Sequence, residues 1–532
     1  MESAQRRGLA LVALTLVALA LRSVGLGRFE LWVDEAATWW FARLVWGGGL
    51  ALESAQESTP PLYYAIVGLA MRLFGDSDAV LRLPSALAGT ATVPLLFAFA
   101  RRLGGERVGW FAAILLTVHP LHIFYSREAR PYPLLLFCTV LLFHTLWNAL
   151  EDDTRRDWAW FSAALFGVCC LHFMGFFLGF VVGVQILIFG RGFRGRVRGL
   201  TAAAVAGLLL LPYVLWTLPD VGGNRALWST ERLYEMIPED VRFGRVLEMQ
   251  MVGADYHPMM RGMDRPPTPP LLRLLALTAQ FTLIITGLLW AFRNGLQRGW
   301  GFLFVGWMLS ILGPWGISQV WKPIHHPGRH DFYATGVVMV LLALGLEALL
   351  SWKRRGLGRS VFTMSVLALA LGAFFRLVSL AQLPPGDQSR AKGRWLAEHA
   401  DSDHDRVVAT GILRAITERY TRLAGGDVPF QTFPSSVDEH PGWSDDRALI
   451  EDPEALAQDA RETVAGLAGS EHVYLLLRPY QRDGDRFSAT WLVDRHVMAA
   501  LRSAGWEPRE DERARELGIE IYEPSSTPGD PP

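Results

Sequence analysis

The feature that most constrains this chain is a series of apolar segments, 14 to 22 residues long, that recur between residues 8 and 380. A helix needs about 20 mainly apolar residues to cross the hydrocarbon core of a bilayer. Only 19% of the residues are charged, against about 25% in soluble domains. The pattern excludes a disordered chain, a disulfide scaffold and an ordinary soluble enzyme. It predicts a polytopic α-helical membrane protein with eleven spans: 8–26, 79–100, 108–124, 133–150, 158–171, 175–190, 199–217, 271–292, 299–318, 332–351 and 360–380.

The basic residues of the short connections predict the orientation. The first span follows Arg6 and Arg7; without a small-residue cleavage site we expect a retained helix and not a signal peptide. With the N-terminus in the cytoplasm, every cytoplasmic connection carries two to four Arg or Lys residues, as the positive-inside rule requires. Those residues are Arg6, Arg7, Arg101, Arg102, Arg107, Arg155, Arg156, Arg191, Arg194, Arg196, Arg198, Arg293, Arg298, Lys353, Arg354, Arg355 and Arg359. The C-terminal part then lies on the extracytoplasmic side. We expect a multi-pass protein of a bacterial inner (plasma) membrane.

Two domains follow from this pattern: residues 1–383 in the membrane and an extracytoplasmic domain of residues 384–532. We expect residues 27–78 to form an external loop with a juxtamembrane helix near 61–74, which is too short to span, and residues 218–270 to form a large external loop. In the C-terminal part, strand-like runs at 406–410 and 472–477 alternate with helix-like stretches, which predicts a small α/β domain. The net charge of −1 gives no sign of a nucleic-acid partner.

Asp34 and Glu35 are adjacent carboxylates that follow the first span among aromatic residues. A carboxylate near low-dielectric lipid tends to have a raised pKa, which suits a general base. The alternative is structural, because acidic side chains also favour a helix N-terminus. Both interpretations stay open from this motif alone.

The loop after the third span, which runs from His119 to Tyr132, is dense in ionisable groups. Arg127 and Arg130 are suited to bind a phosphate, and Glu128 can pair with them, ligate a metal or hold a sugar hydroxyl. The alternative is a belt of interfacial side chains that anchors helix ends. Arg82 starts the second span, where it either reaches the interface or binds phosphate.

A third cluster precedes the tenth span, where Lys322 and Arg329 are suited to an anionic head group. His325 and His326 invite a metal interpretation, although adjacent residues rarely face one ion. His257, in the large external loop, is a further weak metal candidate. No cofactor is certain, and a divalent metal stays open. The three Cys residues lie in apolar runs without ligand spacing, so we expect them to pack as small core residues.

The charge rule places Asp34, Glu35, Glu128, Arg329 and the His candidates, which lie on four separate loops, on the external side of the membrane. This is the arrangement expected for a substrate that is held in the bilayer and converted at its surface. Few carboxylates lie in mid-span, which weighs against an ion-coupled transporter. A lipid or glycan transporter and a non-catalytic membrane scaffold remain the alternatives.

Four motifs in this order resemble the GT-C superfamily of membrane glycosyltransferases. They are Asp34-Glu35 after the first span, Thr59-Pro60-Pro61-Leu62-Tyr63-Tyr64, Leu81-Arg82-Leu83-Pro84-Ser85 and Tyr125-Ser126-Arg127-Glu128-Ala129-Arg130-Pro131-Tyr132. The last three resemble the bacterial branch with protein O-mannosyltransferases and lipid A aminoarabinose transferases. The resemblance covers about residues 8–380.

The resemblance implies an enzyme, a hexosyl- or pentosyltransferase of the cell envelope, whose donor is a polyprenyl-phosphate-linked sugar. It transfers the sugar, typically with inversion, to a hydroxyl of a lipid, glycan or protein acceptor on the extracytoplasmic face. Asp34 then matches the general base and Glu35 its neighbour. Glu128 matches the second acidic position, and Arg329 matches a basic position that binds the donor phosphate.

Overall fold

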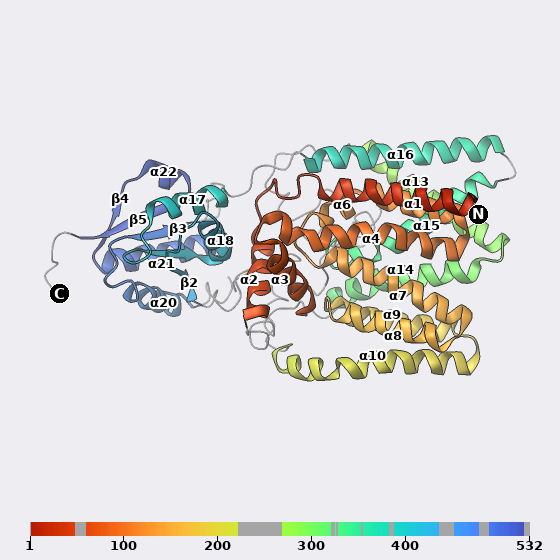
Figure 1. The fold of residues 1–532 in the computed structure, drawn as a ribbon, viewed down its shortest axis with the longest axis horizontal. Coiled ribbons are helices and arrows are strands. Elements are labelled where there is room, and N and C mark those ends of the chain that lie inside the picture. Colours follow the sequence, from red (N-terminus) through yellow and green to blue (C-terminus); the bar gives the residue numbers. More distant parts are fainter. Residues whose placement is uncertain are drawn as a thin grey trace. The chain divides into compact units, whose positions relative to one another are not determined.

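The computed structural model describes residues 2–47, 60–221, 269–320, 325, 328–352, 355–381, 388–435, 452–477 and 489–525. Its contacts divide the chain into two units, which are drawn in Figure 1. Unit 1 comprises Met1–Leu26 and Ser58–Pro384, and unit 2 comprises Gly27–Glu57 and Pro385–Pro532. The sequence predicts a domain boundary at 383/384; the division comes one residue later and also groups residues 27–57 with the C-terminal part.

Unit 1 is helical, and each of the eleven predicted spans corresponds to helix. Its helices are α1 (Glu2–Ser23), α3 (Leu62–Phe74), α4 (Asp78–Gly104), α5 (Glu106–Val118), α6 (Pro120–Ser126), α7 (Tyr132–Asp152), α8 (Arg155–Cys169), α9 (Met174–Phe189), α10 (Gly192–Val221), α13 (Pro270–Arg293), α14 (Gln297–Val320), the 3₁₀ turn η2 (Phe332–Ala334), α15 (Thr335–Leu350) and α16 (Arg355–Ala381). The predicted juxtamembrane helix is α3.

Eight helices of the described residues are long and apolar enough to cross a membrane. The predicted span 108–124 is a bent pair, because α5 and α6 meet at 60°. The break has a local cause: Pro120 cannot donate a backbone hydrogen bond and starts α6, while the His119 side chain accepts the amide of His122 at 3.3 Å. α8 and α9 are helices of 15 and 16 residues, shorter than a straight span requires.

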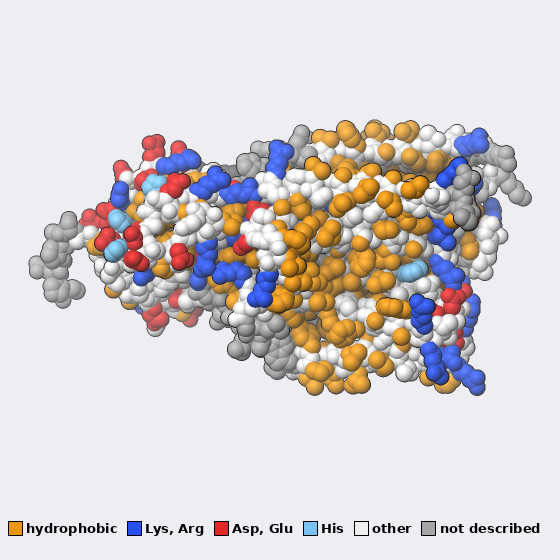
Figure 2. Space-filling view, in the orientation of Figure 1, with side chains coloured by type: hydrophobic (Ala, Val, Ile, Leu, Met, Phe, Trp, Pro, Cys, Tyr) orange, Lys and Arg blue, Asp and Glu red, His pale blue; other side chains and the backbone are white. Residues whose placement is uncertain are grey.

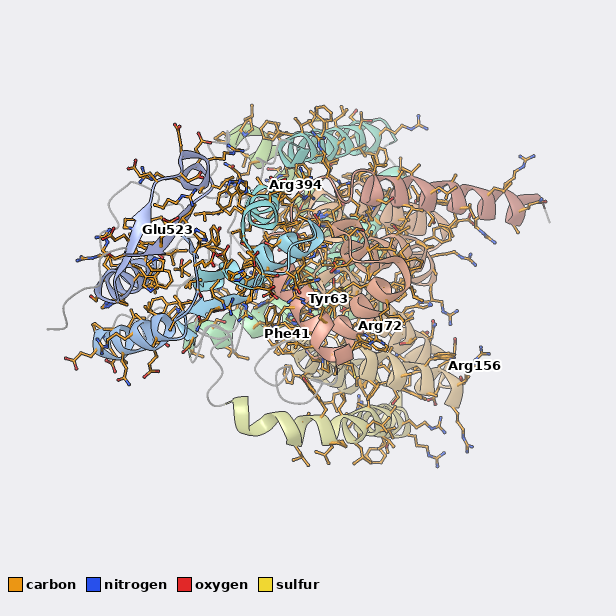
Figure 3. The ribbon with its side chains drawn as sticks, turned by 60° about the vertical axis from the view of Figure 1, so that its left-hand side comes forward. Phe41, Tyr63, Arg72, Arg156, Arg394 and Glu523 are labelled. Atoms are coloured by element: carbon orange, nitrogen blue, oxygen red, sulfur yellow. The ribbon has the colours of Figure 1, made fainter. Side chains whose placement is uncertain are left out.

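One end of unit 1 gathers the connections that the charge rule assigns to the cytoplasm. Lys and Arg side chains are concentrated there, next to a flank of hydrophobic side chains (Figure 2), and Arg156 is labelled at this end in Figure 3. Ion pairs join helices that are distant in sequence: Arg7–Glu106, Arg102–Asp152, Arg107–Glu347, Arg191–Glu151, Arg198–Asp153 and Arg298–Glu151. The predicted external connections therefore lie at the other end of the same bundle.

The centre of the bundle is α15, which is apolar except for Thr335 at its start and Glu347 near its end and is buried at almost every position. A helix that is hydrophobic all round belongs in a core. It packs closely on α13, since a Cβ atom placed on Gly345 would lie 2.1 Å from the backbone oxygen of Leu283. Small residues allow such close approach between membrane helices.

Unit 2 contains the predicted α/β domain. Its strands are β1 (Arg406–Thr410), β2 (Phe430–Phe433), β3 (Val473–Leu476), β4 (Trp506–Arg509) and β5 (Ile519–Pro524), in the order β2-β1-β3-β5-β4. β1 is parallel to β2 and β3, and β5 is antiparallel to β3 and β4. Its helices are α2 (Val33–Gly47), α17 (Ser389–His399), η3 (Gly411–Leu413), α18 (Arg414–Leu423), α20 (Pro453–Ala465), α21 (Ala489–Ser503) and α22 (Glu512–Glu516).

The sheet of unit 2 separates two apolar clusters. One cluster includes Val408, Leu475 and side chains of α20 and α21. The other includes Val407, Tyr474 and side chains of α17. Successive residues of a strand point to opposite faces, so both faces of the sheet are covered.

Candidate active site

The loop between α6 and α7 carries Arg127, Glu128 and Arg130, and hydrogen bonds from α3 and α4 fix it. The Ser85 hydroxyl on α4 donates to the backbone oxygen of Arg130 at 2.8 Å. The Tyr63 hydroxyl on α3 lies 2.9 Å from the same Ser85 oxygen. The side chains of Tyr63, Ser85 and Arg130 are all buried. The Tyr63-Ser85 contact therefore links the second and third motifs of the sequence directly to the fourth.

Two arginines converge on the hydroxyl of Tyr132, the first residue of α7. The Nε of Arg329 donates to this oxygen at 3.0 Å, and an Nη of Arg130 lies 3.5 Å from it. Each guanidinium carbon is 5.6 Å from the centre of the Tyr132 ring. Residues almost 200 positions apart thus present two cations around one phenol, an arrangement that suits a doubly charged anion.

Acidic groups complete this cluster. Glu128 is buried, at 7% exposure, and its amide bonds the carbonyl of Tyr125 at 3.1 Å. Tyr125 packs edge-on against Tyr132 and lies in electrostatic range of Arg329, Glu128 and Asp331. Glu128, the predicted acidic position, and Arg329, the predicted phosphate-binding arginine, therefore both act electrostatically on Tyr125.

Arg82 and Arg127 lie beside this cluster and contact the C-terminal end of α1. Arg127 donates to the carbonyls of Val24 at 2.7 Å and of Leu21 and Gly25 at 3.3 Å. Arg82 donates to the Leu26 carbonyl at 2.8 Å. Burial, and to a lesser extent the positive charge of Arg82, lower the pKa of Arg127. Cations stabilise a helix C-terminus, so these contacts give both arginines a structural role; their phosphate-binding role stays a prediction.

His325 and Asp331 are fully buried and form a pair before α15. Nε2 of His325 lies 3.2 Å from Oδ2 of Asp331, whose other oxygen accepts the Gly328 amide at 2.8 Å. In the part of the chain that the structure describes, no three His, Cys, Asp or Glu side chains are placed to hold a metal ion. The predicted metal candidates His257 and His326 lie outside the described residues, as does Lys322, which was predicted to bind phosphate.

The acidic motif of unit 2 forms the first turn of α2. Glu35 is buried, and its Oε2 accepts the Trp32 amide at 3.3 Å, which closes the helix N-terminus as in a capping box. Asp34 is only half-buried, and its backbone oxygen accepts the Thr38 hydroxyl at 3.1 Å. The structural interpretation therefore fits Glu35, and Asp34 is the more exposed residue of the two.

The structure thus brings Glu128, Arg130 and Arg329 together in unit 1 and places Asp34 and Glu35 in unit 2. That the two sets act on one substrate stays a prediction. The sequence pattern assigned no role to Tyr132 or Asp331. The one local signal is that each lies two residues after a candidate arginine, Arg130 and Arg329 respectively.

An apolar cavity of about 180 Å³ lies between α5, α13, α15 and α16. Ile114, Met339 and Leu369 line it, together with His119 and Gln280 near the break between α5 and α6. Its lining is almost wholly hydrocarbon, so it suits an apolar chain and not a sugar.

Comparisons with known proteins extend these observations. Residues 58–216 match the family described as dolichyl-phosphate-mannose-protein mannosyltransferase. Over 159 residues the chain is 28% identical to undecaprenyl phosphate-alpha-4-amino-4-deoxy-L-arabinose arabinosyl transferase 1 of Pseudomonas fluorescens. That match covers 29% of this chain and 28% of the relative.

Solved structures match the chain almost end to end. ArnT from Cupriavidus metallidurans bound to undecaprenyl phosphate has a TM-score of 0.58 at 13% identity, covering 98% of this chain and 99% of that one. The oligosaccharyltransferase AglB from Archaeoglobus fulgidus, in complex with an inhibitory peptide and a dolichol-phosphate, has a TM-score of 0.55 at 14% identity. The match covers 97% of this chain and 74% of that one. These likenesses confirm the predicted fold as a polytopic helical unit, of the type seen in these structures, with a small C-terminal sheet domain. They do not confirm the predicted count of eleven spans, because eight described helices, or nine with the bent pair, are long and apolar enough to span.

Proposed function

We propose that this GT-C-fold chain is an integral-membrane glycosyltransferase that moves a sugar from a polyprenyl-phosphate donor to an acceptor hydroxyl. The observation that carries the proposal is the pair Arg329 and Arg130 around Tyr132, beside buried Glu128, at one end of a membrane bundle. Cations at the end of an apolar bundle match a ligand with an anionic head and a hydrocarbon tail. A polyprenyl phosphate has both parts.

The names of the similar proteins support this donor class. The matched family acts from dolichyl phosphate, the curated relative from an undecaprenyl phosphate sugar, and the two solved structures hold undecaprenyl phosphate and dolichol-phosphate. The apolar cavity between α5, α13, α15 and α16 is a candidate place for part of the prenyl chain.

The chemistry is a displacement at the anomeric carbon. The acceptor oxygen forms a bond to this carbon while the bond to the phosphate oxygen breaks, and the polyprenyl phosphate leaves. Asp34 takes the proton of the acceptor hydroxyl as general base. Arg329 and Arg130 stabilise the negative charge that the phosphate acquires, the kind of stabilisation that dominates many enzymatic rate enhancements. Glu128 holds the acceptor or sugar hydroxyls.

The orientation and the membrane are part of the proposal. The arginine-rich end of unit 1 faces the cytoplasm of a bacterium by the positive-inside rule. The opposite end and unit 2 then face the extracytoplasmic side of the inner membrane. The acceptor is a lipid, glycan or protein hydroxyl on that side.

The test is donor turnover by purified protein in nanodiscs. Undecaprenyl-phosphate and dolichyl-phosphate donors carrying mannose, glucose, galactose, arabinose or 4-amino-4-deoxy-arabinose are supplied with a membrane extract as acceptor. Free polyprenyl phosphate is then measured by mass spectrometry. We expect release from one donor, whose sugar decides between a hexosyl- and a pentosyltransferase. Sugar transfer from nucleotide sugars alone, or no release from any lipid donor, would contradict the proposal.

A further inference from the structure

The segment that leads into the acidic motif is bound by the C-terminal α/β domain at every residue from Gly27 to Leu31. One side chain, Arg390 at the start of α17, donates to three successive carbonyls: Gly27 at 2.8 Å, Arg28 at 3.0 Å and Phe29 at 2.9 Å. A guanidinium has five N–H donors in a rigid plane, so it can hold several acceptors in one fixed arrangement.

The next two residues are held by different groups of the domain. Oε2 of Glu30 accepts the amide of Ser389 at 2.8 Å, and the amide of Leu31 donates to the Tyr420 hydroxyl at 2.8 Å. Tyr420, on α18, is 5% exposed. The Arg390 guanidinium carbon lies 5.8 Å from the centre of its ring, so the two anchoring side chains also contact each other.

The helix that follows is fixed at a third point. Arg414 lies over the ring of Trp40, with its guanidinium carbon 5.2 Å from the ring centre. Its Nε donates to Oε2 of Glu418 at 3.0 Å. α2 is therefore bound at its entry and along its length by groups that follow it by more than 340 residues in sequence.

Asp34 lies three residues beyond the last of the entry contacts, that of Leu31, in the turn that Glu35 closes. The backbone at this point has little freedom, because its preceding carbonyls, its amide at Leu31 and its capping carboxylate are all bonded. Loss of one of these side-chain contacts would allow α2 to shift and would displace the Asp34 carboxylate. Displacement of a reacting group by about 1 Å costs on the order of 10²-fold in rate.

We propose that Arg390 and Tyr420 are positioning residues, through which the C-terminal α/β domain fixes the entry of α2 and thereby the place of the Asp34 carboxylate. The inference rests on the proposed function for its catalytic consequence, and on the hydrogen bonds above for its structural one. It makes the C-terminal domain responsible for the position of the proposed general base, whatever acceptor the domain also binds.

The experiment compares Tyr420→Phe, Arg390→Lys and Arg390→Ala with wild type. The matched control is Arg394→Ala, an exposed residue on the same helix as Arg390 (Figure 3). We expect kcat to fall about tenfold in Tyr420→Phe and about 10²-fold in Arg390→Ala, with Arg390→Lys between them, while the donor KM stays within twofold. Arg394→Ala keeps both constants within twofold.

A double-mutant cycle separates positioning from general loss of structure. In the Asp34→Asn background, Tyr420→Phe should change the residual rate by less than twofold, because the group that it positions is already gone. Independent, multiplying losses would overturn the proposal, as would wild-type kcat in Arg390→Ala.

Hydrogen exchange gives a readout that does not depend on turnover. We expect the amides of residues 31–36 to exchange about tenfold faster in Tyr420→Phe and Arg390→Ala, with unchanged exchange in β1. Unchanged exchange at 31–36 would overturn the anchoring itself. Absence of turnover in wild type, with faster exchange in the variants, would instead count against the proposed function and leave the anchoring supported.

Discussion

The hydroxyl of Tyr132 gives the sharpest test of how the donor phosphate is bound. Tyr132→Phe removes one oxygen and leaves a ring that is 1% exposed and packed against Tyr125 at 5.0 Å between centroids. The variant loses the acceptor of the 3.0 Å bond from Arg329 and the group that lies 3.5 Å from Arg130. Ring packing is retained, so the change addresses the two arginines alone.

The magnitude follows from that lost bond. A hydrogen bond that involves a charged group contributes about 1.5–3 kcal/mol. Arg329 is only half-buried, so water replaces part of the contact and we expect about 1–2 kcal/mol. At about 1.4 kcal/mol for each factor of ten, the donor kcat/KM should fall about 5- to 30-fold.

The assay is polyprenyl phosphate release at donor concentrations below KM, in nanodiscs. The matched control is Tyr522→Phe, which removes a hydroxyl bonded to Glu520 at 2.9 Å in the C-terminal domain. That control should leave kcat/KM unchanged. Equal values for Tyr132→Phe and Tyr522→Phe would refute the reasoning that the phenol orients the phosphate-binding arginines.

Two further predictions concern stability and pH. Gly345→Ala places a Cβ atom 2.1 Å from the Leu283 oxygen, which should destabilise the bundle by about 1–3 kcal/mol and lower its melting temperature in detergent. In the control Gly316→Ala the new Cβ atom meets nothing within 4 Å, so the melting temperature should not change. Equal melting temperatures for the two variants would contradict the packing described. The hydrogen bond to Asp401 raises the pKa of His404 above 6.5, so its stabilising contribution is complete below pH 6.5 and is lost as pH rises through the folded pKa. A histidine NMR titration should show a resonance with a pKa above 6.5 that is absent in His404→Gln; persistence of that resonance would contradict the assignment.

Much of unit 1 could be predicted because its signals are local. The length of each apolar run predicts a helix, and the arginines of the short connections predict which helix ends lie together. The ion pair between Arg102 and Asp152 joins two such ends, those of α4 and α7. The bend between α5 and α6 was also encoded, by Pro120, but a hydropathy pattern does not register a 60° change in direction. The sequence therefore predicted one straight span there.

The roles of individual arginines could not be predicted, because they depend on partners distant in sequence. Arg127 and Arg130 are three residues apart in one motif, yet Arg127 bonds the carbonyls that end α1 and Arg130 faces Tyr132. Nothing local distinguishes a guanidinium that caps a helix from one that meets a ligand. The grouping of α2 with the C-terminal domain has the same origin, since Arg390 contacts residues more than 360 positions earlier.

The most direct measurement is sugar transfer by wild type and Asp34→Asn with the donor that the panel identifies. Loss of a general base costs about 10²–10⁴-fold in rate. The account predicts a fall in kcat of this size with an unchanged donor KM, while the variant folds and binds the donor as wild type does. Equal kcat in the two proteins would contradict the role of Asp34 and the mechanism built on it.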